Sequence, residues 1–373
     1  MGSALRTTRA LALVGGILLL LVAPAAVAGG ASPDDTARLL AGMPPATASP
    51  LQPFARSGSW QRHAKVFDAA WAQLEKRQLA NIRTWSAHQL KPQPVAYYMF
   101  SGPDFLYANA FFPDASTYVL SALEPVGAIP NVEGLPDQAL AREVDRLQRS
   151  LNSVLSYSFF ITKKMKTELS GGRLNGTLPV LYVFLARSGK TIRDVSLVSI
   201  DPEGVLHPPS ETIAGNTAKG AKITFAGSDG KEQTLYYFST DLSDDGVKKS
   251  GFLKFCSGLG QGDSLLKSAS YLLHSGNFST VRDFILDHSN AIVQDDSGIP
   301  VRDFKPDNWK LLAFGNYVGP LSIFPRTYQP MLKELYRKGR AGPLDFGIGY
   351  RWRPQQSNLL LAIKNGAKTA QGQ

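Results

Sequence analysis

The spacing of apolar residues predicts two long helices. Between residues 60 and 88 the large apolar side chains recur at steps of three and four residues, which places them on one face of a helix. This stripe consists of Trp60, Ala64, Phe67, Trp71, Leu74, Ile82 and Trp85. The same spacing predicts a helix from Asp137, as N-cap, to about residue 160. We expect both apolar faces to be core, although a tryptophan stripe also suits an aromatic ligand groove.

Shorter apolar runs without this spacing predict strands. The expected strands are residues 94–100, 116–123, 178–186, 191–200, 222–225, 233–238, 291–294, 309–314 and 344–352. Helices are expected at residues 263–274, 279–288 and 327–338. This irregular alternation predicts an α/β or α+β fold with a mixed β-sheet flanked by helices.

The chain divides by composition. Residues 29–58 are rich in Pro, Ala and Ser, and the prolines prevent a continuous helix, so we expect a flexible tether with a short helical turn. The remainder predicts two α/β lobes, at residues 59–205 and 206–373. One continuous domain over residues 59–355 is the alternative.

The first residues have the form of a signal peptide. Arg6 and Arg9 precede an apolar run at residues 10–22, and Ala26-Val27-Ala28 provides small residues for cleavage after Ala28. The run is short for a bilayer span, which disfavours an uncleaved anchor. We therefore expect a periplasmic or extracellular protein with no transmembrane segment after cleavage.

The charge of the chain narrows the class of partner. The formal net charge is +10, and the basic residues are scattered along the sequence. This surplus favours an anionic envelope ligand, or it serves solubility alone. Basic residues are not interleaved with aromatic ones, so we expect no nucleic-acid partner.

A single cysteine, Cys256, excludes an intramolecular disulfide. It lies in an apolar stretch, which favours a buried, inert thiol. No histidine spacing typical of a metal site is present, and we expect no metal and no cofactor.

Two familiar motifs are incomplete around residue 264. Ser264-Leu265-Leu266-Lys267 has the Ser-x-x-Lys spacing of penicillin-binding serine enzymes, but its companion motifs are misplaced. The glycines at residues 258–262 lack the remaining positions of a phosphate-binding loop. A flexible loop followed by a helix that Asp263 or Ser264 caps explains both better.

The loop after the strand at residues 94–100 is a first candidate site. Ser101 and Gly102 lead into Asp104, and ligands of α/β sheets collect where strands end. Gly102 allows close approach, and Ser101 and Asp104 offer hydrogen-bonding groups. The alternative role of Asp104 is a helix N-cap.

A second group of polar residues lies between residues 274 and 307. His274 and Arg282 are candidate ligand-binding residues, and His288, Asp295 and Asp296 are candidate catalytic residues with Asp104. Carboxylates beside histidine suit general acid–base chemistry. The alternative is a set of helix caps and surface charges.

These features leave three functions open. The first is a secreted, soluble protein that binds a small molecule or an anionic envelope polymer, or has an accessory role. The second is a periplasmic hydrolase that uses Asp104, His288, Asp295 and Asp296. The third is a structural partner in an envelope complex, for which we expect a wide apolar surface patch. Oligomeric state is left open.

Overall fold

The computed structural model describes residues 30–159, 167, 170–209, 217–227, 229–338 and 341–366. Ala31–Gln373 forms one compact unit. The signal peptide expected at residues 1–28 lies outside the described residues. In the described ranges, every helix is too short or too polar to cross a bilayer.

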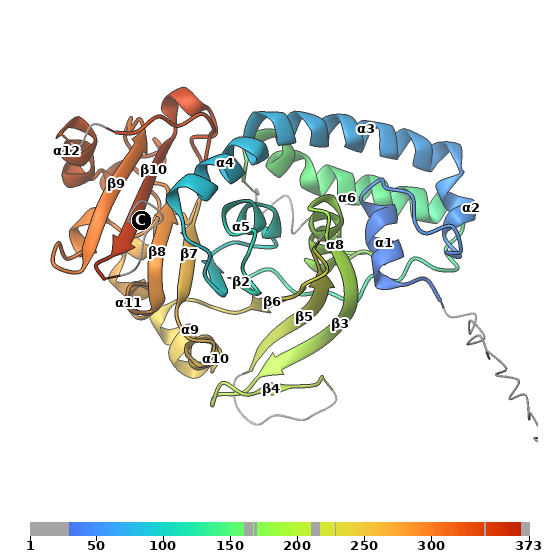
Figure 1. The fold of residues 1–373 in the computed structure, drawn as a ribbon. Helices are drawn as coiled ribbons and strands as arrows, with labels where there is room; N and C mark the ends of the chain where they lie inside the picture. The colour runs from blue at the N-terminus through green and yellow to red at the C-terminus, as the bar shows by residue number, and fades with distance from the viewer. Residues whose placement is uncertain are drawn as a thin grey trace, which may run out of the picture. The chain divides into compact units, whose positions relative to one another are not determined.

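A ten-stranded mixed sheet runs through the described part of this unit (Figure 1). The strand order is β4-β3-β5-β6-β2-β1-β7-β8-β10-β9. Their bounds are β1 Val95–Met99, β2 Thr117–Ala122, β3 Thr191–Ile200, β4 Leu206–His207, β5 Ala218–Ala226, β6 Glu232–Ser239, β7 Gly262–Leu266, β8 Ser289–Gln294, β9 Trp309–Gly315 and β10 Asn358–Lys364. Parallel pairing joins the five central strands, which are β6, β2, β1, β7 and β8 in sheet order, and the outer pairs are antiparallel. The expected mixed sheet flanked by helices is confirmed.

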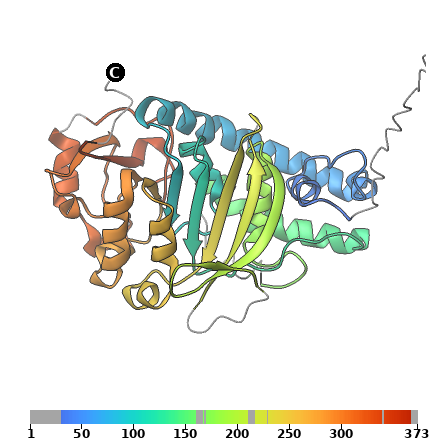
Figure 2. The ribbon, with the colours of Figure 1, turned by 60° about the horizontal axis from the view of Figure 1, so that its bottom comes forward.

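Helices cover both faces of the sheet (Figures 1 and 2). Along β1, Ala96 and Tyr98 enter one apolar core while Val95, Tyr97 and Met99 enter the other, because successive side chains of a strand point to opposite faces. The first core is covered by α1 Pro33–Leu40, α2 Gln52–Ala55, α3 Gly58–Leu74, α4 Ala80–Gln89, α5 Phe105–Phe111, α6 Asp137–Tyr157 and α8 Leu178–Arg187. The second is covered by α9 Asp244–Lys249, α10 Phe252–Gly258, α11 Ser279–His288 and α12 Pro330–Lys338.

The first predicted helix is confirmed as core. The chain runs from α3 through a π-helical turn, η1 Glu75–Leu79, into α4. Its tryptophans Trp60 and Trp85 are buried, and Trp71 packs partly buried against the same core. The second predicted helix is α6, but Pro136, and not Asp137, occupies its N-cap position. Asp137 instead lies in the first turn, where its charge favours the helix dipole.

The strand expected at residues 178–186 is wrong, because these residues form α8. Every residue from Leu178 to Ala186 is buried, so the helix has no polar face and no helical period. A continuous apolar run of this length fits a buried helix and a buried strand equally. Pro179, in the first turn of α8, is compatible with a helix start.

The helix expected at residues 263–274 is also wrong at its start, where the chain forms β7. Asp263 and Ser264 lie inside this central strand and cap no helix. The Asp263 carboxylate accepts the Ala291 N–H at 3.0 Å, and the Ser264 hydroxyl shares a 2.7 Å hydrogen bond with Ser289. Both partners come from β8, so the polar groups are satisfied across strands.

Two further segments differ from expectation. Where we expected a flexible tether with a short helical turn, α1 Pro33–Leu40 confirms the helical turn, but α2 Gln52–Ala55 adds a second one, and Leu39 and Leu40 are fully buried. Residues 344–352 make only isolated bridges and no strand, while the strand of that region is β10.

Cys256 is fully buried, and burial raises the pKa of its thiol well above the usual value, as an inert thiol requires.

Candidate functional site

The centre of the sheet contains a topological switch point. After β1 the chain crosses to β2 on one side, and after β7 it crosses to β8 on the other. Strands β1 and β7 are parallel neighbours, so their carboxyl ends meet at one edge. Ligands of open α/β sheets bind in the crevice at such a point.

A cavity of about 310 Å³ lies at this edge. It is lined by the loop after β1, by Glu124 after β2, by Asp241 after β6 and by residues 267–270 after β7. Ser101, Gly102 and Asp104, which the sequence singled out, are among its lining residues. The volume is at the lower end of the range for small-molecule sites.

A buried ion pair in the wall of the cavity joins the two central loops. The Asp104 carboxylate lies 2.9 Å from the Lys267 ammonium, and the two residues are 1% and 3% exposed. The Tyr98 hydroxyl donates to the same carboxylate oxygen at 3.0 Å. Asp104 is also the N-cap of α5, accepting the Tyr107 N–H at 3.3 Å. The N-cap alternative for Asp104 is therefore confirmed, together with an ionic contact that the sequence did not indicate.

Lys267 is held by three different groups. Besides Asp104, its ammonium donates to the Ser158 carbonyl and lies 4.0 Å from the centre of the Tyr107 ring. A buried ammonium needs such partners, because removing it from water is costly. The sequence reasoning missed Lys267, since it placed the residue inside a helix. The available signal was a lysine directly after an apolar run, Leu265-Leu266.

The loop after β7 has an unusual backbone. Ser268, Ser270 and Tyr271 all have left-handed φ values of 52–56°. This conformation costs a non-glycine residue about 1–2 kcal/mol. Strain of this kind persists only where surrounding contacts fix it, and it concentrates at functional sites.

Asp295 fixes the start of that loop. Its carboxylate accepts the Ser268 N–H at 3.0 Å and both the N–H and the hydroxyl of Ser297. Burial, and next the neighbouring charge of Asp296, raise the pKa of Asp295 to about 6. Asp104 and Asp295 thus contact the consecutive residues Lys267 and Ser268, and both carboxylates raise the pKa of Tyr98 beyond the effect of burial.

Asp296 faces a different set of partners. It accepts the Tyr271 hydroxyl at 2.7 Å and the Asn358 amide at 3.0 Å. Burial raises the pKa of Asp296 as well. Through Tyr271 the residue holds the far end of the strained loop, so both adjacent aspartates fix loop geometry.

Two buried side-chain polar atoms of the cavity lining have no hydrogen-bond partner among the described residues. They are the Oε2 atom of Glu124, a residue only 6% exposed, and the hydroxyl of Ser268. A buried carboxylate oxygen without a donor is costly. Glu124 was missed from the sequence because it follows β2 in a loop without a distinctive motif.

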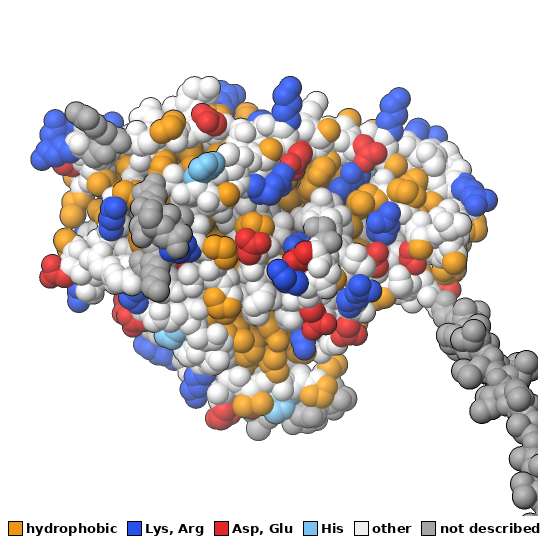
Figure 3. All heavy atoms as spheres, viewed as in Figure 1, with side chains coloured by type: hydrophobic (Ala, Val, Ile, Leu, Met, Phe, Trp, Pro, Cys, Tyr) orange, Lys and Arg blue, Asp and Glu red, His pale blue; other side chains and the backbone are white. Residues whose placement is uncertain are grey.

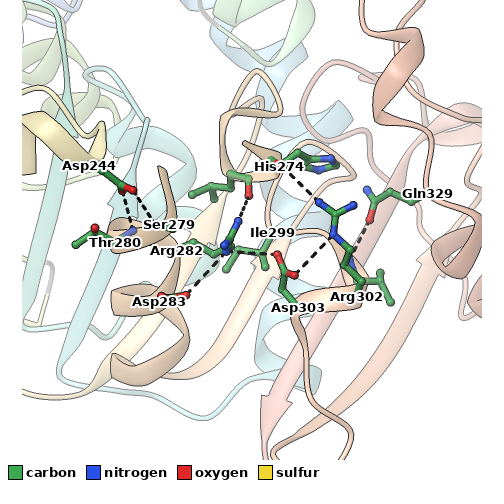
Figure 4. A network of polar contacts seen from close by, with 12 residues as sticks. Asp244, His274, Ser279, Thr280, Arg282, Asp283, Ile299, Arg302, Asp303 and Gln329 are labelled. Atoms are coloured by element: carbon green, nitrogen blue, oxygen red, sulfur yellow. Dashed lines mark hydrogen bonds and ion pairs between the residues drawn. The ribbon is translucent and has the colours of Figure 1, made fainter. Parts of the chain in front are cut away.

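The other sequence candidates lie elsewhere. His288 ends α11 and precedes β8, at the opposite edge of the sheet, where its ring stacks on Phe284 at 4.1 Å. Arg282 donates to the Leu273 carbonyl and pairs with Asp303 (Figure 4). His274 lines a separate cavity beside Arg302. The structure therefore brings Ser101, Gly102, Asp104 and Asp295 to one edge and places these three residues away from the first cavity.

Within the described residues, no group of three or more metal-ligating side chains is positioned to hold an ion. Comparisons with protein-family models, with curated proteins and with solved structures find no match.

Proposed function

We propose that this chain is an exported binding protein whose ligand occupies the cavity at the carboxyl ends of β1 and β7. The observation that carries this proposal is the buried carboxylate oxygen of Glu124, which lines a ligand-sized cavity and has no hydrogen-bond partner in the described part of the chain. A ligand that donates a hydrogen bond would satisfy this atom. The apolar leader with its two arginines supports export.

Binding explains the site better than catalysis because the other carboxylates are engaged. Asp104 accepts from Tyr98, Lys267 and Tyr107, and Asp295 accepts from Ser268 and Ser297. A general base needs a free acceptor within reach of the proton that it takes. These aspartates instead hold the loops in place.

The lining favours a neutral or cationic ligand that is rich in hydroxyl or amine donors. Three carboxylates, from Asp104, Glu124 and Asp241, line the cavity with one lysine that is already paired. An anion would be repelled there, so the positive net charge of the chain as a whole does not predict an anionic ligand for this cavity. On the face drawn in Figure 3, lysine and arginine side chains are dispersed among the other types.

Aromatic side chains form much of the remaining wall. Phe100, Phe159, Phe278 and Tyr350 line the cavity, and Phe159 packs against Tyr350 with ring centres 5.2 Å apart. Flat apolar surfaces combined with a few polar groups are typical of small-molecule sites. A compact polyol or amino sugar matches this combination.

Three sugars that differ in one substituent test the proposal. Glucosamine, glucose and glucuronate present a cation, a neutral group and an anion on the same ring. We expect glucosamine to raise the melting temperature of the mature protein most and glucuronate not to raise it. Glu124→Gln should weaken glucosamine binding about tenfold or more by calorimetry, as loss of a charge-assisted hydrogen bond implies.

Glu232→Gln is the matched control. Glu232 opens β6, is exposed and does not line the cavity. The Glu232→Gln substitution removes the same charge as Glu124→Gln and should leave glucosamine binding unchanged. Equal losses in both variants, stabilisation by glucuronate alone, or no shift with any of the three sugars would contradict the proposal.

A hydrolase is the second candidate, on one observation. Ser268 lies two residues after the end of β7 in a left-handed conformation, a position that suits a strand-end nucleophile, and its hydroxyl has no hydrogen-bond partner among the described residues. A serine nucleophile also needs a base, and Ser268 has no such hydrogen bond among the described residues. Labelling of Ser268 by a fluorophosphonate would favour this candidate, and no labelling would leave binding as the function.

A further inference from the structure

A second cavity, of about 350 Å³, lies on the other side of the strained loop after β7. Tyr271 and His274 form one wall, Pro300 to Arg302 form another, and residues 326–331 close it. Its lining contains two arginines, Arg302 and Arg326, and no acidic side chain. The charge is thus opposite to that of the first cavity.

The positive charge here is only partly neutralised. Arg302 lies 3.8 Å from the carboxylate of Asp303, which also pairs with Arg282 at 3.3 Å (Figure 4). Arg326 has no ion pair among the described residues. Arg282 also lies 3.9 Å from the Asp283 carboxylate. The Asp303 carboxylate is therefore shared between Arg302 and Arg282, and Arg326, which lines the cavity, has no counterion among the described residues.

His274 adds a polar atom without a partner. Its Nε2 is buried and has no hydrogen-bond partner in the described part of the chain. Burial, and next the charge of Arg302, lower the pKa of His274 to about 4, so the ring is neutral at pH 7. A neutral imidazole has one N–H, and an anion would compete for it with the backbone carbonyls of Asp296 and Gly298, which partly oppose the lowering of the pKa of His274.

The rim of this cavity is apolar and exposed. Tyr328 and Met331 line it with 51% and 57% of their surfaces exposed, and Pro330 lies between them. These neighbouring side chains offer an apolar ligand a surface to contact at the mouth of the cavity. The cavity thus combines cationic groups with an apolar rim.

We propose that this second cavity binds a small organic anion with an apolar tail, with the anionic group between Arg302, Arg326 and His274 and the tail against Tyr328 and Met331. Arginine suits carboxylates because its planar fork donates two parallel hydrogen bonds. The proposal uses none of the residues of the first cavity, so it stands apart from the proposed function.

Octanoate is the probe for the test, measured by calorimetry on the mature protein. Octan-1-ol carries the tail without the charge, acetate carries the charge without the tail, and octylamine reverses the charge. We expect octanoate to bind at least about tenfold more tightly than each of the other three. Equal binding of octanol, tighter binding of octylamine, or no detectable octanoate binding would overturn the proposal.

Variants then locate the anion. Arg326→Met removes a cation that holds no described protein partner, so its effect reports on the ligand and not on folding. We expect it to weaken octanoate binding about tenfold, the loss given by one charge-assisted contact, and Arg302→Met to do the same. Arg337→Met is the matched control, since Arg337 lies on nearby α12, pairs with Glu334 and does not line the cavity.

An independent readout follows His274 directly. Octanoate should shift the imidazole ¹⁵N resonances of His274 and leave those of His63, which lies in another part of the fold, unchanged. Glu124→Gln, which alters the first cavity, should not change octanoate affinity. If Arg326→Met binds octanoate as tightly as the unmodified protein, or if His274 does not respond, the anion site is not where we place it.

Discussion

Replacing Lys267 by methionine tests whether the buried ion pair with Asp104 organises the site. Methionine retains most of the apolar stem but removes the ammonium. The carboxylate of Asp104, which is 1% exposed, would then keep only the Tyr98 hydroxyl and the Tyr107 N–H as hydrogen-bond donors among the described residues. We expect this variant to be strongly destabilised because a buried charge would lose its counterion.

The distance between the two charges sets the size of the expected loss of stability. At 2.9 Å and an effective dielectric constant of about 20, two opposite unit charges attract by about 6 kcal/mol. Much of this offsets the cost of removing both ions from water, so the net contribution of the intact pair is small. Breaking the pair leaves that cost uncompensated, and Lys267→Met should lower the free energy of unfolding by about 3–5 kcal/mol.

A double-mutant cycle separates the pair from ordinary packing. Asp104→Asn keeps an N-cap for α5 and an acceptor for Tyr98, and it removes only the charge. The double variant buries no unpaired charge, so its cost should fall short of the sum of the single costs by at least about 2 kcal/mol. Urea unfolding at constant m-value provides the measurement. A loss below about 1 kcal/mol for Lys267→Met, or additive single costs, would refute the reasoning.

Two further predictions concern other buried groups. Burial raises the pKa of Asp263 to about 7, above its value in the unfolded chain. Between these two values the folded state holds a proton that the unfolded state releases. The free energy of unfolding should therefore fall as the pH rises from about 4 to 7. Asp263→Asn should be as stable as the unmodified protein near pH 3.5 and more stable by a few kcal/mol at pH 8, as thermal unfolding across this range would show; parallel pH profiles would contradict this. Gly349→Ala should cost more than about 3 kcal/mol, because φ is +62° and the new Cβ would lie 1.6 Å from the Asp295 carboxylate, whereas Gly258→Ala, in open space, should be neutral or stabilising in the same urea assay.

The sequence predicted correctly the two long helices with a visible period and most of the short apolar strands, β1 and β2 among them. The helical stripe that contains Trp60 and Trp85 became α3 to α4, and the strands expected at residues 222–225 and 233–238 became the antiparallel neighbours β5 and β6. The strand expected at residues 178–186 is an error that complete burial explains. In α8 no residue from Leu178 to Ala186 faces water, so no alternation distinguishes helix from strand.

Polar residues inside β7 misled the prediction for a different reason. Asp263 and Ser264 have the chemistry of helix caps, but β8 supplies their partners. Cross-strand partners are non-local, and a single sequence does not state which strands are neighbours. The same error hid Lys267, the residue that joins the two loops of the site.

The candidate site illustrates what local sequence can and cannot contain. The contact of Tyr98 with Asp104 spans six residues and could be anticipated from a strand that ends before an aspartate. The contact of Asp104 with Lys267 depends on the strand order, since β7 enters the sheet beside β1 only after the chain has built β2 to β6. Asp295 reaches Ser268 for the same reason, through the parallel pairing of β7 with β8. A polar residue at a strand end is therefore a sound candidate for a binding site from local sequence alone, but the residue that it contacts follows from the topology. Here the topology brings the Asp104–Lys267 ion pair, the strained loop after β7 and Glu124 to one cavity.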